Sequence, residues 1–241
     1  MITYIDYKEG TTNLLLTASH GGNKKPDTIP NRTKGKLFRD TYTQPLVYKL
    51  LDKFSYYNKP YYIIADIHRK KIDLNRNLSN GTERNPYQEA IWYYWNYVLS
   101  KSKYEILDKN KYGLHIDIHS HNNSDEFHLG YNLSTETCIK LAKGWRVLGS
   151  SLDSIDKDLN NMVHGKYSLK SSMEKFGFSI FEPTLGKEYF NGGYNIETSN
   201  GNGLGGIQIE IPVSVLRVKR EEIIEALYES IIIFKENFID K

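Results

Sequence analysis

The run His115-Ile116-Asp117-Ile118-His119-Ser120-His121 alternates ionisable and apolar side chains at a period of two. If the run is a β-strand, its isoleucines point to one face, and its histidines and aspartate point to the other. Three imidazoles and one carboxylate in seven residues are typical of a metal site or an acid/base site. The alternative interpretation is a half-exposed edge strand with its polar face toward water.

Apolar runs of suitable length for strands and helices lie on both sides of this segment. We predict strands at 13–17, 61–65, 112–118, 178–181 and 207–211, and helices at 40–54, 85–99, 135–148 and 220–234. The glycine-rich stretch 191–206 is predicted to be a loop. Strands that alternate with helices favour the α/β class, with a mostly parallel mixed sheet flanked by helices.

Length and composition favour a single domain over residues 1–241, because a chain of this length with 39% hydrophobic residues buries one sizeable core. The net charge of +3, with both signs mixed, argues against a nucleic-acid partner. No apolar run approaches the roughly 20 residues of a membrane span, so no membrane partner is expected. The single cysteine, Cys138, and the charged N-terminal residues favour a reducing, cytoplasmic location.

Polar side chains follow the predicted strands where ligands of open α/β sheets bind, beyond the carboxyl ends of the strands. His20 follows the first of these strands, and His119 ends the third. Glu210 lies inside the apolar strand 207–211, where a carboxylate is costly unless it is paired or bound to metal. A buried ion pair between Glu210 and an arginine is the alternative explanation.

The segment Arg69-Lys70-Lys71-Ile72-Asp73-Leu74-Asn75-Arg76 follows the second strand. An arginine binds a carboxylate through two parallel hydrogen bonds, so this segment predicts recognition of an acidic group. A basic, solvated connection between two elements would have a similar composition.

In combination these pieces resemble the N-formylglutamate amidohydrolases, a family with the zinc carboxypeptidase-like (phosphorylase/hydrolase-like) fold. Six short motifs occur in the order of the family, from residue 14 to about 217: Ser19-His20-Gly21-Gly22 with Pro30, Asp40-Thr41-Tyr42-Thr43 with Leu46, Arg69 to Arg76, Asp117-Ile118-His119-Ser120, Gly192-Gly193-Tyr194 and Gln208-Ile209-Glu210-Ile211. Each motif alone is weak, whereas six in order rarely arise by chance. The segment 129–188 matches no motif of the family.

The resemblance implies a catalytic site with one divalent metal ion, zinc in the family, and an open coordination position. By this likeness His20 and His119 are the imidazole ligands, and Asp40 is the third ligand. Asp117 is the rival for that position. It lies about 6.6 Å along the same strand face from His119, which better suits a residue that orients the imidazole.

The resemblance also implies the remaining roles in the site. Glu210 is the general base that takes a proton from the water at the metal, and Arg69 stabilises the oxyanion. Asn75 and Arg76 hold the free carboxylate of the substrate, and Tyr194 closes over it. These roles agree with the chemistry of the side chains, since a carboxylate shuttles protons and an arginine supplies fixed positive charge.

The predicted function is therefore hydrolysis of an amide bond next to a free carboxylate, with N-formyl- or N-acyl-amino acids as the first candidates. One alternative is a zinc carboxypeptidase that acts on peptides or on cell-wall-derived material. The other is a non-catalytic ligand-binding relative. A binding protein has no need of a general base, so Glu210 together with the histidines favours an enzyme.

Overall fold

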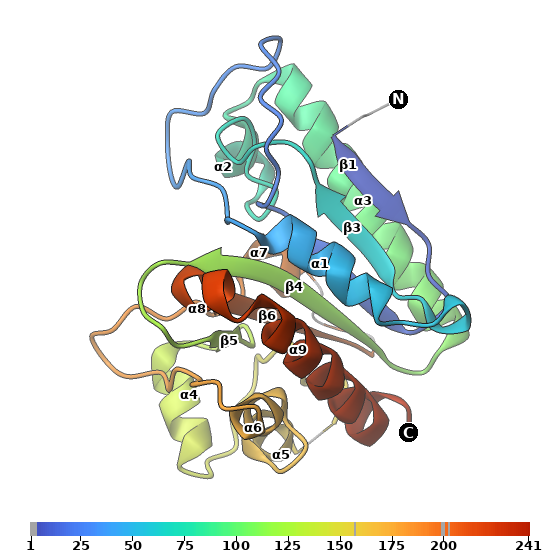
Figure 1. Ribbon diagram of the computed structural model, residues 1–241, viewed down its shortest axis with the longest axis vertical. Coiled ribbons are helices and arrows are strands. Elements are labelled where there is room, and N and C mark those ends of the chain that lie inside the picture. Colours follow the sequence, from blue (N-terminus) through green and yellow to red (C-terminus); the bar gives the residue numbers. More distant parts are fainter. Residues whose placement is uncertain (1–3, 157, 199–200, 202) are drawn as a thin grey trace.

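The computed structural model describes residues 4–156, 158–198, 201 and 203–241. Within these residues, six strands form one mixed sheet in the order β1-β3-β2-β4-β6-β5 (Figure 1). The strands are β1 (Ile5–Lys8), β2 (Leu14–Ala18), β3 (Tyr61–Ala65), β4 (Gly113–His121), β5 (His128–Gly130) and β6 (Leu204–Pro212). The four inner strands β3, β2, β4 and β6 are parallel, and the edge strands β1 and β5 are antiparallel to their neighbours. The predicted α/β fold with a mostly parallel mixed sheet is confirmed.

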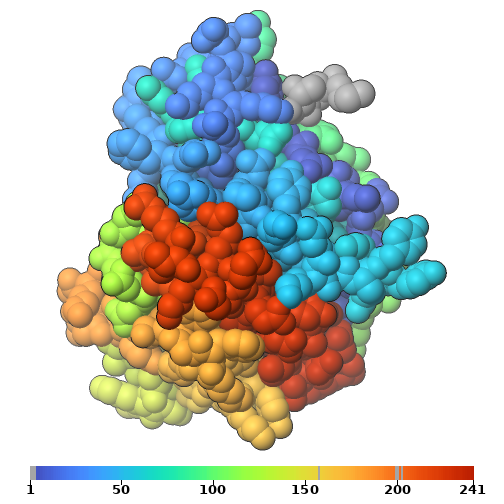
Figure 2. Space-filling model, viewed as in Figure 1, coloured from blue at the N-terminus to red at the C-terminus, as the bar shows by residue number. Residues whose placement is uncertain are grey.

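Helices cover both faces of the sheet. The helices α1 (Thr43–Asp52) and α9 (Arg220–Phe234) pack on one face, and the long helix α3 (Pro86–Lys109) packs on the other (Figure 1). Figure 2 shows the C-terminal helices in direct contact with the N-terminal half of the chain over the first face. The shorter helices are α2 (Leu78–Thr82), α4 (Thr135–Ala142), α5 (Leu159–His164), α6 (Leu169–Lys175), α7 (Gly193–Glu197) and α8 (Val213–Val218), with single turns at Tyr56–Asn58 and Lys235–Ile239. None of the described helices is both long and apolar enough to cross a membrane.

The alternation in β4 divides its side chains between the two faces as predicted. Leu114, Ile116 and Ile118 are fully buried in the core beneath α1 and α9. Asp117 and His119 are equally buried, although they are polar and face the other side. Strand β4 lies between β2 and β6, so the edge-strand interpretation is wrong. Its polar face is enclosed by protein and must be satisfied there.

The element boundaries differ from the prediction where local signals are weak. Helix α3 begins as predicted, because the Asn85 side chain accepts hydrogen bonds from the first-turn N–H groups. It continues past residue 99 because buried Ser102 and Ile106 extend its apolar stripe. Segment 178–181 contributes only an isolated bridge between Phe127 and Ile180. The stretch 191–206 is not all loop, since it contains α7 and the first residues of β6.

Candidate metal centre and active site

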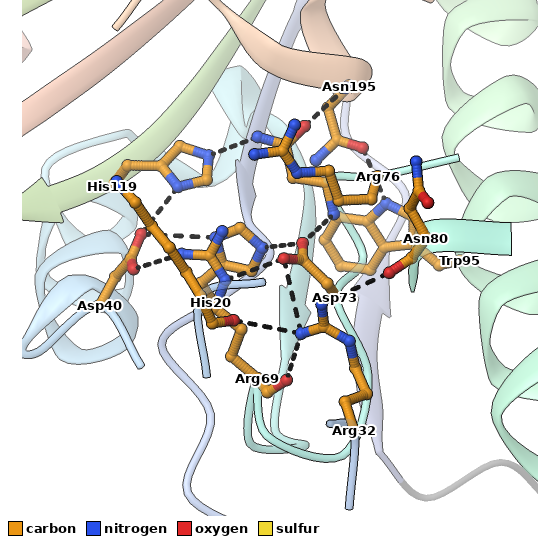
Figure 3. A network of polar contacts seen from close by, with 12 residues as sticks. His20, Arg32, Asp40, Arg69, Asp73, Arg76, Asn80, Trp95, His119 and Asn195 are labelled. Atoms are coloured by element: carbon orange, nitrogen blue, oxygen red, sulfur yellow. Dashed lines mark hydrogen bonds and ion pairs between the residues drawn. The ribbon is translucent and has the colours of Figure 1, made fainter. Parts of the chain in front are cut away.

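Two histidines and an aspartate meet at the carboxyl end of the parallel strands (Figure 3). His20, Asp40 and His119 are all buried, and each offers a ligand atom within 4.8 Å of the other two. Asp40 Oδ2 lies 2.8 Å from His119 Nδ1 and 3.5 Å from His20 Nδ1. The imidazole rings meet edge to face with their centroids 4.9 Å apart. The structure therefore brings together the three residues predicted as metal ligands.

The loop after β2 carries His20 and is tied to the segment that carries Asp40. The backbone N–H of Asp40 donates to the carbonyl of His20 over 3.0 Å. Gly21 follows His20 and packs against the first turn of α1, where an added Cβ would lie only 2.5 Å from Thr43 Oγ1. Only glycine allows this close approach of loop and helix.

Buried carboxylates face the outer nitrogens of both rings. His20 Nε2 lies 2.6 Å from Asp73 Oδ1, and His119 Nε2 lies 2.9 Å from Asp117 Oδ2. Asp117 also accepts a hydrogen bond from the Thr17 hydroxyl at 2.6 Å, which fixes its second oxygen. An imidazole that donates its Nε2–H to a carboxylate carries its lone pair on Nδ1. When the two rings are neutral, both lone pairs therefore point toward the space beside Asp40.

The charges around the centre favour a cation. Burial by itself would keep His119 neutral, but Asp117 and Asp40 raise the pKa of this imidazole well above its ordinary value. His20 Nδ1 is buried and has no hydrogen-bond partner in the described part of the chain. Two imidazole nitrogens and one carboxylate oxygen are a donor set typical of catalytic zinc sites. The residues present therefore fit a divalent metal ion.

Arg69 and Asp73 form the wall behind His20. Arg69 is buried and donates to Asp73 Oδ2 at 3.0 Å and to Asp40 Oδ1 at 3.3 Å. Burial disfavours the charge on Asp73, yet His20 and Arg69 hold the pKa of this carboxyl well below its usual range. The buried side chain of Arg32 adds a further positive charge 3.7 Å from Asp73. The guanidinium of Arg69 is thus held rigidly next to the centre.

Glu210 lies beside His119, because the two residues are direct partners in the parallel pairing of β4 and β6. Burial raises the pKa of Glu210 to about 7. Its Oε1 accepts a hydrogen bond from Gln208 Nε2 at 2.6 Å. Among the described residues, no arginine lies within ion-pair distance of Glu210, so the buried ion pair considered as an alternative does not form. The carboxylate instead lines a cavity.

A cavity of about 520 Å³ opens over these groups. Seven of the predicted site residues line this cavity: His20, Asp40, Arg69, Asn75, Arg76, His119 and Glu210. Asn75 is buried, whereas Arg76 is exposed and forms no ion pair with any described residue. Tyr194 is placed elsewhere, since its ring packs against Trp92 with the centroids 6.0 Å apart, and it is not one of the described residues that line the cavity.

Known proteins resemble this chain in structure more than in sequence. A scan against models of protein families finds no match, and a search of curated proteins finds no significantly similar sequence. The crystal structure of N-formylglutamate amidohydrolase from Ralstonia eutropha JMP134 superposes with a TM-score of 0.62 at 12% identity, over 98% of this chain and 100% of that one. The chain has the fold of N-formylglutamate amidohydrolase. The gene product Atu2144 from Agrobacterium tumefaciens is similar to the same degree, with a TM-score of 0.63 at 13% identity over 97% of this chain and 94% of its own.

Within this N-formylglutamate amidohydrolase fold, the structure adds residues to which sequence reasoning gave no role. Asp73 lies in the motif Arg69 to Arg76, and its position between two arginines was the available signal. Gln208 could have been inferred from Glu210, because residues two apart on a strand share a face. Asn195 gave no signal, since it lies in α7 inside the predicted loop.

Asn195 joins two parts of the candidate site. Its backbone N–H donates to Asn75 Oδ1 at 2.7 Å, and its Nδ2 donates to Asp117 Oδ2 at 3.2 Å. The indole N–H of Trp95 donates to its Oδ1 at 3.2 Å (Figure 3). With its oxygen occupied in this way, Asn75 holds its amide nitrogen 3.3 Å from His119 Nε2, the ring nitrogen that also faces Asp117.

Proposed function

We propose that this chain is a metal-dependent hydrolase that cleaves an amide bond next to a free carboxylate, of the N-formyl- or N-acyl-amino acid amidohydrolase type. One observation carries the proposal. Two imidazoles turn their Nδ1 atoms toward Asp40 while buried carboxylates hold their Nε2 atoms, and a buried glutamate stands beside them in the same cavity. A purely structural cluster has no need of a cavity or of an unpaired glutamate.

His20, Asp40 and His119 would hold one divalent ion, which we propose to be zinc. When bound, this ion polarises the scissile carbonyl and lowers the pKa of water to about 7. Asp40 is favoured over Asp117 as the third ligand because Asp117 lies at the outer nitrogen of His119. Both oxygens of Asp117 already accept hydrogen bonds from neighbouring side chains.

Glu210 would act as the general base. Its raised pKa of about 7 places it close to neutral pH, where a carboxylate both accepts and returns a proton efficiently. The hydrogen bond from Gln208 to Oε1 fixes the orientation of the carboxylate and leaves Oε2 to take the proton from the attacking water. The same oxygen would then deliver that proton to the leaving amine.

The arginines would divide the negative charges of the reaction between them. Arg69 is held by two carboxylates and cannot move far, so it offers fixed positive charge to the developing oxyanion. Arg76 is exposed, lines the cavity and has no ion-pair partner among the described residues, so it would bind the free carboxylate of the substrate through two hydrogen bonds, with the Asn75 amide beside it.

The substitution Glu210→Gln tests this proposal. Glutamine keeps the volume and the hydrogen bond from Gln208 but cannot accept the proton, so turnover should fall by about 10²- to 10⁴-fold while zinc content and fold are kept. The assay follows release of free amine from N-formyl- and N-acetyl-amino acids, with melting temperature and metal content measured on the same samples. Glu222→Gln, on the exposed face of α9, is the matched control. A stable, zinc-loaded Glu210→Gln variant with unchanged turnover would rule out this role.

A further inference from the structure

The order of the strands lays out the cavity floor in a line. Asn75 and Arg76, which we call the carboxylate clamp, follow β3 in the chain. His20 follows β2, His119 lies in β4, Glu210 lies in β6, and β5 forms the edge of the sheet. Asn75 lies 3.3 Å from His119 Nε2 and is hydrogen-bonded to α7, so the clamp lies over β4, whereas β5 lies two strands away, beyond β6. A substrate with its carboxylate in the clamp and its carbonyl at the histidines therefore sends its acyl group toward β6 and β5.

Aromatic rings form the cavity wall on the β5 side. His121, Tyr189 and Phe190 line the cavity there. The Phe190 ring lies 5.3 Å from the ring of His121 and 5.1 Å from that of His128, measured between centroids. Behind this layer, Phe181 stacks on His128 at 4.3 Å. The wall is therefore a packed set of planar side chains.

This aromatic wall carries no net charge. The Nδ1 atom of His121 accepts the backbone N–H of Asn123, and its Nε2–H donates to the carbonyl of Glu126, which defines a neutral imidazole. The nearest charges on the wall compensate each other, since Lys36 Nζ lies 3.6 Å from Glu188. The same ammonium lies 4.9 Å from the centroid of the Phe190 ring. A charged acyl group would find no unpaired partner at these residues.

We infer that this wall is an acyl subsite that takes an arylacyl group, so that the substrates are amides between an aromatic acyl group and an amino acid with a free carboxylate. The inference rests on the proposed function. A formyl group adds only a hydrogen atom beyond the carbonyl carbon and would leave Phe190 and His121 without contact. An aromatic acyl group stacks on these rings and removes apolar surface from water. The arylacyl group comes either from an N-arylacyl-amino acid or from an aromatic residue before the scissile bond of a peptide.

The test compares substrates that share one leaving amino acid, so that contacts at the clamp cancel. The zinc-loaded 241-residue chain is assayed with N-formylglutamate, N-phenylacetylglutamate and phenylalanylglutamate, and kcat/KM is measured for each. We expect the kcat/KM for N-phenylacetylglutamate to exceed that for N-formylglutamate by about tenfold or more. The dipeptide identifies the source of the arylacyl group. A higher kcat/KM for phenylalanylglutamate than for N-phenylacetylglutamate indicates a peptide substrate, and the reverse order indicates an N-arylacyl-amino acid.

Variants locate the preference on the wall. Phe190→Ala should lower the ratio of kcat/KM for the phenylacetyl compound to that for the formyl compound by about tenfold. Phe176→Ala removes a ring that is 44% exposed and lies outside the cavity, so it should leave the ratio as it is. An unchanged ratio in Phe190→Ala, or a preference for the formyl compound in the unaltered protein, overturns the acyl subsite and leaves the proposed hydrolase standing. If no compound is cleaved, the hydrolase proposal fails. The ratio of the dissociation constants of N-phenylacetylglutamate and N-formylglutamate, measured by calorimetry, then tests the acyl subsite by itself.

Discussion

His20 and His119 have matching surroundings, although one lies in the loop after β2 and the other lies in β4. The Nε2 atom of each ring faces a buried carboxylate, which is Asp73 for His20 and Asp117 for His119. The orientation of each ring is thereby fixed before any ion arrives, so the side chains need to move little to bind one. At the scale of the residue, the outer carboxylates contribute to the site by orienting its ligands.

Metal binding should depend on these residues in a graded way. The chain is expected to bind about one zinc ion, and His20→Ala or His119→Ala should abolish tight binding because each removes one of three ligands. Asp40→Ala should cost more affinity than Asp117→Ala, for which about 10- to 100-fold is expected. Competition with a chromophoric chelator measures these affinities. His164→Ala, on α5, is the control, and full zinc occupancy in either histidine variant of the centre would contradict the ligand assignment.

Substrate recognition should depend on the shape of the Arg76 side chain as well as its charge. Conversion of the substrate carboxylate to a primary amide should remove most activity, because the guanidinium then loses its anionic partner. Arg76→Lys keeps the charge but not the two-pronged geometry, so KM should rise about tenfold or more. Steady-state kinetics with free-acid and amidated substrates measure both effects. Arg146→Lys, at an exposed position, is the control, and equal turnover of acid and amide would exclude the clamp.

At the scale of the element, the five-residue helix α7 connects the clamp to the metal centre. Its residue Asn195 is fully buried and contacts Asn75 through the backbone and Asp117 through the side chain. A helix this short is marginal by itself, so its position depends on such contacts. A shift of α7 should therefore displace Asn75 of the clamp and Asp117, the partner of His119, together.

Substitutions of Asn195 separate the two connections. Asn195→Ala keeps the backbone donor to Asn75 but removes the side-chain contacts with Trp95 and Asp117 that hold α7 in place, so it should lower zinc affinity and raise KM together, each by about tenfold. Asn195→Asp likewise keeps the backbone donor to Asn75 and also keeps an acceptor for Trp95, so α7 stays anchored, but it places an oxygen against Asp117. Zinc affinity should then fall while KM changes less. Calorimetric zinc titration and steady-state kinetics are the two readouts, with Asn237→Ala as control; a loss of stability alone, with both constants unchanged, would show that Asn195 only supports the fold.

Predictability from sequence followed the strength of local patterns. The period of two in β4 assigned Asp117 and His119 to one face, and the stripe of 220–234 gave the bounds of α9. The edge strands β1 and β5 were missed because they have four and three residues, too few for a pattern to stand out. The contacts of Asn195 could not be predicted, because they join segments 78 and 120 positions apart.

At the scale of the whole molecule, the site is assembled from segments that are distant in the chain. Asp40 and His119 are 79 positions apart and meet only when β2, β4 and the start of α1 are in place. An unfolded chain does not hold these ligands together, so an ion that binds the site binds the folded state almost exclusively. Metal binding and global stability are therefore coupled.

Zinc should consequently raise the melting temperature of the protein. At a free concentration of 100 times Kd the added stability is about 2.7 kcal/mol. For a chain of this size, that corresponds to roughly 5 to 10 °C. Thermal unfolding followed by circular dichroism, with and without chelator, measures the shift. In His20→Ala the melting temperature should not respond to zinc, and an equal response in this variant would place the ion elsewhere.

The glycine after His20 illustrates how a position without a functional group governs those that have one. Gly21 is closed to any larger residue by the backbone and side chains at the start of α1. A single methyl group at this position would push α1 and the preceding Asp40 away from the histidines. Every functional group of the site would still be present. A screen for inactive variants should therefore recover substitutions of Gly21 together with substitutions of the ligands. The largest side chain that residue 21 accepts without loss of activity would measure how far Asp40 can move from the histidines.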